Sequence, residues 1–151
     1  GTSAVLGKGM DMSGLRTVRD VMATDVTTLD MNDKLSIADD VMRLGRIRHM
    51  PVLDSDGAVV GVVTQRDLFR GALARNLGYG EHAQQKILDM LFVKDVMTND
   101  PATIGHDELL SEAAQILYER QIGCLLVVED EKLIGILTEG DFVRLKLPTA
   151  E

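Results

Sequence analysis

Residues 61–67 read Gly-Val-Val-Thr-Gln-Arg-Asp, and residues 135–141 read Gly-Ile-Leu-Thr-Glu-Gly-Asp. Both stretches place a glycine inside an apolar run and follow it with a threonine and an aspartate three positions apart. This pattern is typical of a buried strand that gives way to a helix, because threonine and aspartate oxygens accept hydrogen bonds from the first N–H groups of a helix. Since the pattern occurs twice, the chain is predicted to contain two copies of one structural unit.

The repeat extends beyond these two stretches. Asp20-Val21-Met22 recurs as Asp95-Val96-Met97 at an offset of 75 residues, and a deletion of one residue in a turn then changes the offset to 74. Further identical pairs are Asp25 and Asp100, Leu35 and Leu110, Ala38 and Ala113, Ile47 and Ile122, and Val52 and Val127. The predicted organisation is a flexible N-terminal segment at 1–14, a first copy at 15–75, a connecting loop and helix at 76–93, and a second copy at 94–148.

Each copy shows the same order of predicted elements. A short extended piece is followed by an amphipathic helix, then by two apolar runs that flank a tight turn, and then by a second helix. In the first copy the turn is residues 54–57, Asp-Ser-Asp-Gly. The apolar runs are continuous rather than alternating, which indicates sheets covered on both faces. We therefore predict an α+β fold in which two β-α-β-β-α units pack sheet to sheet with pseudo-twofold symmetry, leaving two equivalent clefts.

Composition excludes several classes of function. The chain has 151 residues, of which 45% are hydrophobic and 26% charged, and its net charge is −8. It has two Tyr, three Phe and no Trp, and no basic block of five residues, so we expect no binding to nucleic acid. No apolar run reaches the length of about 18 residues that spans a membrane. Cys124 is the single cysteine, which excludes an internal disulfide and fits a cytoplasmic location.

The two apolar hairpins with their flanking residues resemble the CBS motif, which is named after cystathionine β-synthase. In the first copy the resemblance lies in residues 47–54 and 61–68, and in the second copy in residues 122–128 and 135–142. It covers about 130 of the 151 residues. A tandem CBS pair is called a Bateman module. The resemblance implies a non-catalytic regulatory module that senses an adenosine nucleotide (AMP, ADP, ATP or a related adenosyl ligand) in its clefts, with no cofactor or metal required.

The threonines and aspartates are the first candidate ligand-binding residues. A hydroxyl at Thr64 or Thr138 could donate to a phosphate or a ribose beside the N-terminus of a helix, which favours anions. The carboxylate of Asp67 or Asp141 could accept two hydrogen bonds from the vicinal hydroxyls of a ribose, as in dinucleotide-binding folds. The two glycines lack a Cβ, so a ligand could approach the backbone there. The simpler alternative is that the threonine and the aspartate only cap the following helix.

The resemblance implies further contacts. It places adenine against the start of each copy, at Met22 and Thr27 and at Met97 and Ala102, although methionines are often ordinary core filler. It also implies that Arg48 and His49, just before a strand, contact phosphates held by the other copy. The alternative is that both are solvated loop residues. The second copy has the uncharged residues Gly123 and Cys124 at these positions.

This difference predicts two unequal clefts. The cleft of Met97, Ala102, Thr138 and Asp141 would face Arg48 and His49 and bind phosphate more tightly. The cleft of Met22, Thr27, Thr64 and Asp67 would face the uncharged pair. Arg66 complicates this ranking, because it lies within the first copy's own motif, where the second copy has Gly140.

No nucleophile and base stand in a catalytic arrangement, so we expect no enzyme activity. Cys124 is expected to be a small buried residue, and His82 and His106 lack metal-ligand spacing. A competing hypothesis is a scaffold for dimerisation or protein interaction with one or both clefts non-functional. A homodimer is expected in either case, through apolar helix residues Leu68, Phe69, Leu73, Phe142, Val143 and Leu145. The sequence names neither the adenosyl ligand, nor the occupancy of the clefts, nor a regulated partner protein.

Overall fold

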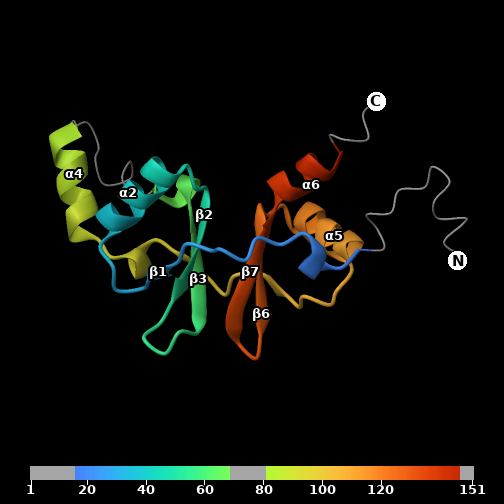
Figure 1. Ribbon diagram of the computed structural model, residues 1–151. Helices are drawn as coiled ribbons and strands as arrows, with labels where there is room; N and C mark the ends of the chain where they lie inside the picture. Colours follow the sequence, from blue (N-terminus) through green and yellow to red (C-terminus); the bar gives the residue numbers. More distant parts are fainter. Residues whose placement is uncertain (1–15, 69–80, 147–151) are drawn as a thin grey trace, which may run out of the picture. The chain divides into compact units, whose positions relative to one another are not determined.

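The computed structural model describes residues 16–68 and 81–146 (Figure 1). Contacts divide the chain into two compact units. The continuous unit is Val26–Pro101, and the split unit combines Gly1–Asp25 with Ala102–Glu151. The predicted flexible segment at 1–14 and residues 69–80 lie outside the described residues.

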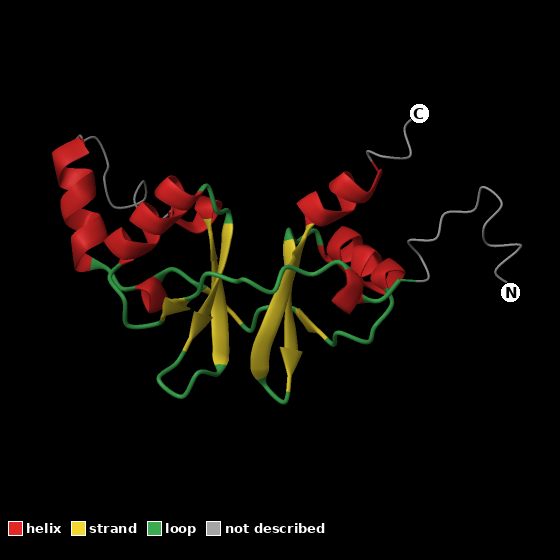
Figure 2. Cartoon of the chain, viewed as in Figure 1, coloured by secondary structure: helices red, strands yellow, loops and turns green. Residues whose placement is uncertain are grey.

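The continuous unit is a four-stranded sheet with helices on one face (Figure 2). Its elements are β1 (Leu29–Asp30), α2 (Leu35–Gly45), β2 (His49–Leu53), β3 (Val59–Thr64), α4 (Glu81–Met90), the short 3-10 helix η3 (Val93–Asp95) and β4 (Thr98–Asn99). The strand order is β1-β2-β3-β4, with β1 parallel to β2 and the other neighbours antiparallel. Helix α2 buries Leu35, Ala38 and Met42 against the sheet, and Leu88 of α4 joins the same core. This helix α4 lies where a connecting helix was predicted.

The split unit repeats this plan with a three-stranded sheet. Its elements are the 3-10 helix η2 (Val18–Asp20), β5 (Thr103–Ile104), α5 (Leu110–Arg120), β6 (Cys124–Glu129), β7 (Lys132–Thr138) and α6 (Glu139–Lys146). The order is β5-β6-β7, and β5 runs parallel to β6. Helix α5 buries Leu110, Ala113 and Leu117 in the core.

The predicted α+β class and the β-α-β-β-α order of each copy are confirmed. The same irregularity even occurs in both copies, since the register shifts between Val52 and Leu53 and between Val127 and Val128. The packing of one sheet against the other stays a prediction. The longest described helices, α2 and α5, have 11 residues each. None of the helices within residues 16–68 and 81–146 is long and apolar enough to cross a membrane.

The start of each sequence copy packs with the body of the other copy. Ala23, from the start of the first copy, exchanges two backbone hydrogen bonds of 2.9 Å with Ile136 in β7. Strand β4, from the start of the second copy, pairs with β3 through Gly61–Asn99 and Val62–Thr98. The copies at 15–75 and 94–148 therefore differ in their boundaries from the compact units, because repeat matching identifies equivalent residues and not the strand that each joins.

Candidate functional site

The junction between β3 and the following helix is closed by its own threonine and aspartate. The Thr64 N–H donates to Oδ2 of Asp67 at 2.9 Å, and the Asp67 N–H donates to Oγ1 of Thr64 at 3.2 Å. The two residues thus cap the start of the helix at residues 65–68. Asp67 is half-buried, and its Oδ1 accepts no hydrogen bond from the part of the chain that the structure describes. The capping role thus uses one carboxylate oxygen of Asp67 and leaves Oδ1 without a hydrogen-bond donor among the described residues.

At the equivalent junction in the split unit, both carboxylate oxygens of the aspartate have partners. The Thr138 N–H donates to Oδ2 of Asp141 at 2.8 Å, and the Arg144 guanidinium binds Oδ1 of Asp141. Asp141 is only 7% exposed. Sequence reasoning missed this ion pair, although the i,i+3 spacing on a helix was a signal for it. Arg70, the equivalent of Arg144 in the first copy, lies outside the described residues.

Each of the two glycines leaves room for a methionine side chain and for a neighbouring backbone carbonyl. A Cβ on Gly61 would lie 2.6 Å from Sδ of Met97 and 2.8 Å from the carbonyl oxygen of Thr98. A Cβ on Gly135 would lie 2.7 Å from Sδ of Met22 and 2.9 Å from the carbonyl oxygen of Ala23. The expectation that a ligand approaches the backbone here is therefore wrong at the Cβ side of both glycines, because protein atoms already occupy that space.

These methionine contacts change the grouping of the candidate residues. Met97 packs on Gly61, in the continuous unit, and Met22 packs on Gly135, in the split unit. Both methionines are half-buried and contact the core of their unit, as the core-filler alternative required. The continuous unit brings together Thr27, Arg48, His49, Thr64, Asp67 and Met97, and the split unit brings together Met22, Ala102, Thr138 and Asp141.

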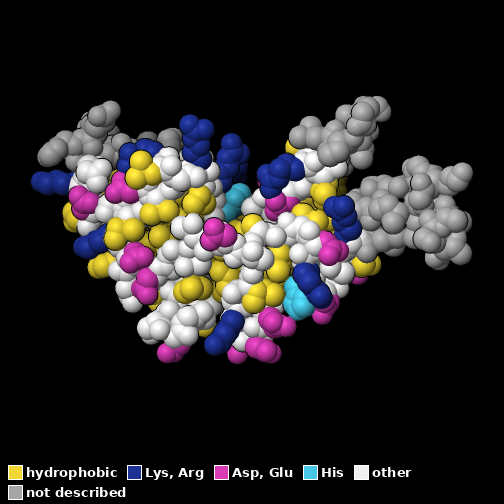
Figure 3. All heavy atoms as spheres, in the orientation of Figure 1, with side chains coloured by type: hydrophobic (Ala, Val, Ile, Leu, Met, Phe, Trp, Pro, Cys, Tyr) yellow, Lys and Arg dark blue, Asp and Glu magenta, His cyan; other side chains and the backbone are white. Residues whose placement is uncertain are grey.

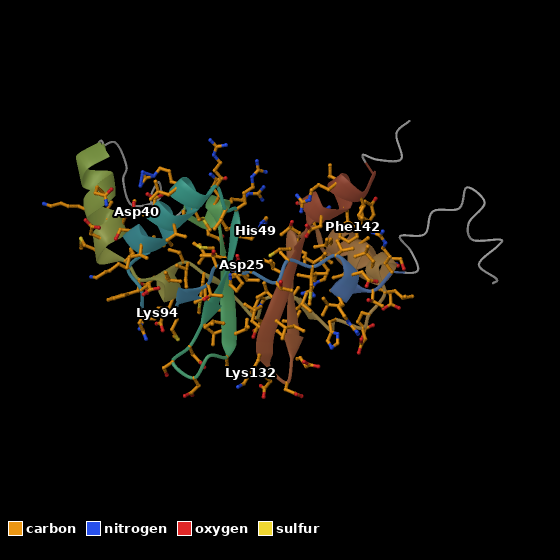
Figure 4. All side chains as sticks on the ribbon, in the orientation of Figure 1. Asp25, Asp40, His49, Lys94, Lys132 and Phe142 are labelled. Atoms are coloured by element: carbon orange, nitrogen blue, oxygen red, sulfur yellow. The ribbon has the colours of Figure 1, made fainter. Side chains whose placement is uncertain are left out.

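The strand entrance has the same backbone geometry in both units but different charges. The Gln65 N–H donates to the carbonyl oxygen of Arg48 at 3.0 Å, and the Glu139 N–H donates to that of Gly123 at 3.1 Å. His49, the first residue of β2, pairs with Thr64, the last residue of β3. Figure 4 labels His49. Arg48 is exposed and His49 is half-buried. At the strand entrance itself, the continuous unit thus has the charged Arg48 where the split unit has the uncharged Gly123.

Cys124 is buried at the start of β6, as expected from its apolar neighbours. Burial raises the pKa of its thiol to about 12, since desolvation disfavours the thiolate. The thiolate is the form that attacks, so this environment does not activate a nucleophile. Within residues 16–68 and 81–146, no group of three or more His, Cys, Asp or Glu side chains could hold a metal ion.

The chain thus contains two β-α-β-β-α units in tandem, and each carries Gly-x-x-Thr-x-x-Asp across the end of a strand. The chain belongs to the CBS domain family, whose model matches residues 18–73 and 93–147.

The chain is similar to part of an enzyme and to solved structures of CBS proteins. A homoserine O-acetyltransferase of Methanohalophilus mahii is 35% identical over 126 residues, which are 83% of this chain but only 23% of that enzyme. CBSX2, whose crystal structure was solved in complex with AMP, shares 30% sequence identity with this chain. Its structure superposes with a TM-score of 0.75, over 90% of this chain and 99% of the CBSX2 chain. The CBS domain pair of MJ0100 was solved in complex with 5′-methylthioadenosine and S-adenosyl-L-methionine. It shares 25% sequence identity with this chain and superposes with a TM-score of 0.74, over 88% of this chain and 97% of that one. CBS domain pairs with similar sequences thus bind adenosine compounds.

Proposed function

We propose that the chain is a non-catalytic regulatory module that senses an adenosine nucleotide and transmits binding to a partner protein. The observation that carries the proposal is the half-buried Asp67 at the N-terminus of a helix, whose Oδ1 accepts no hydrogen bond from the described residues. The adenosine complexes of CBSX2 and of MJ0100 support this ligand class. A cytoplasmic location fits the single unpaired Cys124.

Each group of residues has a defined chemical task in this proposal. The aspartates accept hydrogen bonds from the ribose hydroxyls, the threonine hydroxyls donate to ribose or phosphate, and the half-buried methionine of each unit provides an apolar surface for adenine. Arg48 and His49 provide positive charge for phosphate. The proposed ligand-binding residues are Met22, Thr27, Arg48, His49, Thr64, Asp67, Met97, Ala102, Thr138 and Asp141.

A scaffold with one non-functional cleft is the second candidate. The scaffold is favoured for the split unit, because both carboxylate oxygens of Asp141 are engaged and Gly123 stands where the first copy has Arg48.

The homodimer also remains a proposal, but fewer of the expected interface residues are exposed enough to form it. Leu68 is buried, only 5% exposed, and Phe142 and Leu145 are half-buried, whereas Val143 is 60% exposed. Phe69 and Leu73 lie outside the described residues.

Adenine nucleotides should stabilise the chain and guanine nucleotides should not. At a ligand concentration of about 100 Kd, binding should raise the free energy of unfolding by about 2.7 kcal/mol. At this chain length that is a rise in Tm of several degrees, which a thermal-shift panel of AMP, ADP, ATP, GMP and GTP can measure. Equal stabilisation by GTP and ATP, or hydrolysis of the nucleotide at enzymatic rates, would contradict the proposed function.

The two aspartates should differ in their effect on binding. Asp67→Asn keeps a side-chain oxygen for the Thr64 N–H but removes the charge offered to the ribose, so AMP should bind about tenfold or more weakly in isothermal titration. Asp141→Asn, the matched variant, should change AMP affinity less and lower Tm more, because Asp141 is buried and paired with Arg144. The sequence alone predicted two unequal binding sites for a nucleotide and placed the tighter one at Asp141. If Asp141→Asn abolishes the tighter AMP-binding event and Asp67→Asn leaves it intact, Asp141 and not Asp67 is the main ribose-binding carboxylate.

A further inference from the structure

The outward face of α2 carries a stripe of apolar residues. Ile37, Val41 and Leu44 follow one another at spacings of four and three residues, so they lie within about 60° of one another around the helix axis. Ile37 is 45% exposed and Leu44 is 82% exposed, whereas Val41 is half-buried against the core of the continuous unit. Figure 3 shows hydrophobic side chains gathered on the viewed face of this unit, where α2 lies in Figure 1. We call Ile37, Val41 and Leu44 the α2 stripe.

The fold itself does not require apolar residues at these positions. Helix α5 has the same length as α2 and buries the equivalent residues in its own core. It has Glu112 and Glu119, both exposed, where α2 has Ile37 and Leu44. Because the same helix forms with charged residues there, and because apolar side chains are stabilised when they leave water, the α2 stripe indicates a surface that another protein covers.

Two charged residues flank the α2 stripe on the side away from the core. Asp40, labelled in Figure 4, and Arg43 are three residues apart and form an ion pair within the helix. Since the acidic residue comes first along the helix and the basic residue second, this flank is complementary to itself when two helices run antiparallel. Two copies of α2 related by a twofold axis would place Asp40 of each copy beside Arg43 of the other. The same arrangement brings Ile37 of one copy near Leu44 of the other.

We propose that two copies of the chain associate through the α2 stripe, in an antiparallel contact that uses the continuous unit and not the split unit. This rests on the homodimer of the proposed function and gives it a surface other than the helix residues first expected. Two copies of α5 in the same arrangement would bring Glu112 of one copy near Glu119 of the other, and these like charges repel. A helix of 11 residues is about 16 Å long, so two of them bury less than the about 1,200–2,000 Å² of a stable interface. The dimer should therefore be weak and depend on protein concentration.

The test is sedimentation velocity of the full chain without ligand, at concentrations from about 5 to about 500 μM. The unmodified chain should shift from the 16.5 kDa monomer towards a dimer as the concentration rises. Leu44→Glu introduces the residue type that α5 has at the equivalent position, and it should raise the dissociation constant of the dimer at least about tenfold. The matched control is Tyr118→Glu, which adds the same charge to an 84% exposed residue of α5. This control should leave the dissociation constant within about twofold.

An exchange of charges tests the antiparallel arrangement. Asp40→Arg alone and Arg43→Asp alone should each raise the dissociation constant about fivefold, because each places like charges beside one another in the dimer. The double variant Asp40→Arg and Arg43→Asp restores opposite charges both within each helix and between the two copies. Its dissociation constant should therefore return to within about twofold of the original value.

Each contrary outcome overturns a defined part of the proposal. A dimer that Leu44→Glu leaves intact would show that the α2 stripe is not the contact, while the homodimer stands. Equal dissociation of Tyr118→Glu would assign the effect to added charge in general, and a double variant that stays as weak as the single ones would overturn the antiparallel arrangement. A chain that is monomeric at every concentration would overturn the homodimer as well. None of these results depends on a nucleotide, so the thermal-shift panel tests adenosine sensing separately. Circular dichroism and Tm should match among the variants, because every substituted side chain is exposed.

Discussion

Native Cys124 should react with a thiol reagent such as dithionitrobenzoate at least about tenfold more slowly than Cys124 in the unfolded chain. Burial raises the pKa of the thiol from 9.0 to about 12, and the reaction rate follows the thiolate fraction. The measurement is the rate of absorbance change at pH 8, with the protein in 6 M guanidinium chloride as the fast reference. Rapid stoichiometric labelling of the folded protein would contradict both the burial and the raised pKa.

The same shift gives stability a dependence on pH. The folded pKa lies above the unfolded value, so the folded state keeps its proton while the unfolded state loses it. The contribution of Cys124 is therefore fully present below about pH 9 and is lost as the pH rises from 9 toward 12. Cys124→Ala is the control, since it removes the titrating group and should flatten this part of the profile.

Replacing Gly135 with alanine should lower the free energy of unfolding by about 1–3 kcal/mol, the cost of overpacking a filled core. The new Cβ would meet Sδ of Met22 at 2.7 Å and the carbonyl oxygen of Ala23 at 2.9 Å. The thioether can move, but the carbonyl belongs to a backbone held by two hydrogen bonds to Ile136. Urea unfolding followed by circular dichroism measures the loss.

Gly105→Ala is the matched control in the same unit. Its Cβ would meet nothing closer than Glu108 Cγ at 3.8 Å, so its stability should change little. In the double variant Gly135→Ala and Met22→Ala, only part of the loss attributed to the clash should be recovered, because the carbonyl contact remains. Full stability of Gly135→Ala would show that the start of the first copy does not pack on β7 as described.

The glycine and methionine contacts also affect how the module can be divided. The continuous unit Val26–Pro101 contains its own Met97 and β4, whereas the split unit needs residues 16–25 to fill the space beside Gly135. A fragment cut at the repeat boundary, such as 15–75, would keep Gly61 but lose Met97 and β4. Studies of single units should therefore use the compact boundaries.

Several features were predictable from the sequence because they depend on residues close together in the chain. The order of strands and helices follows from apolar runs and from Thr-x-x-Asp at the strand ends, which are local patterns. The caps at Thr64 and Thr138 formed as their spacing indicated, and Cys124 is buried as its apolar neighbours suggested. The difference in charge between Arg48 and Gly123 was visible by direct comparison of the copies.

Other features required the tertiary structure because they depend on contacts between distant residues. Repeat matching could not show that Met22 packs on Gly135 and Met97 on Gly61, since equivalent segments have the same local pattern whichever sheet they join. The accessibility of Asp67 compared with Asp141 depends on burial and on the position of the Arg144 guanidinium, and these follow from packing. Leu68 was expected to contribute to a homodimer interface, but it is buried in one core cluster with residues of α2 and α4. Local sequence therefore specifies which elements form, and long-range packing selects which of their side chains remain open to a ligand.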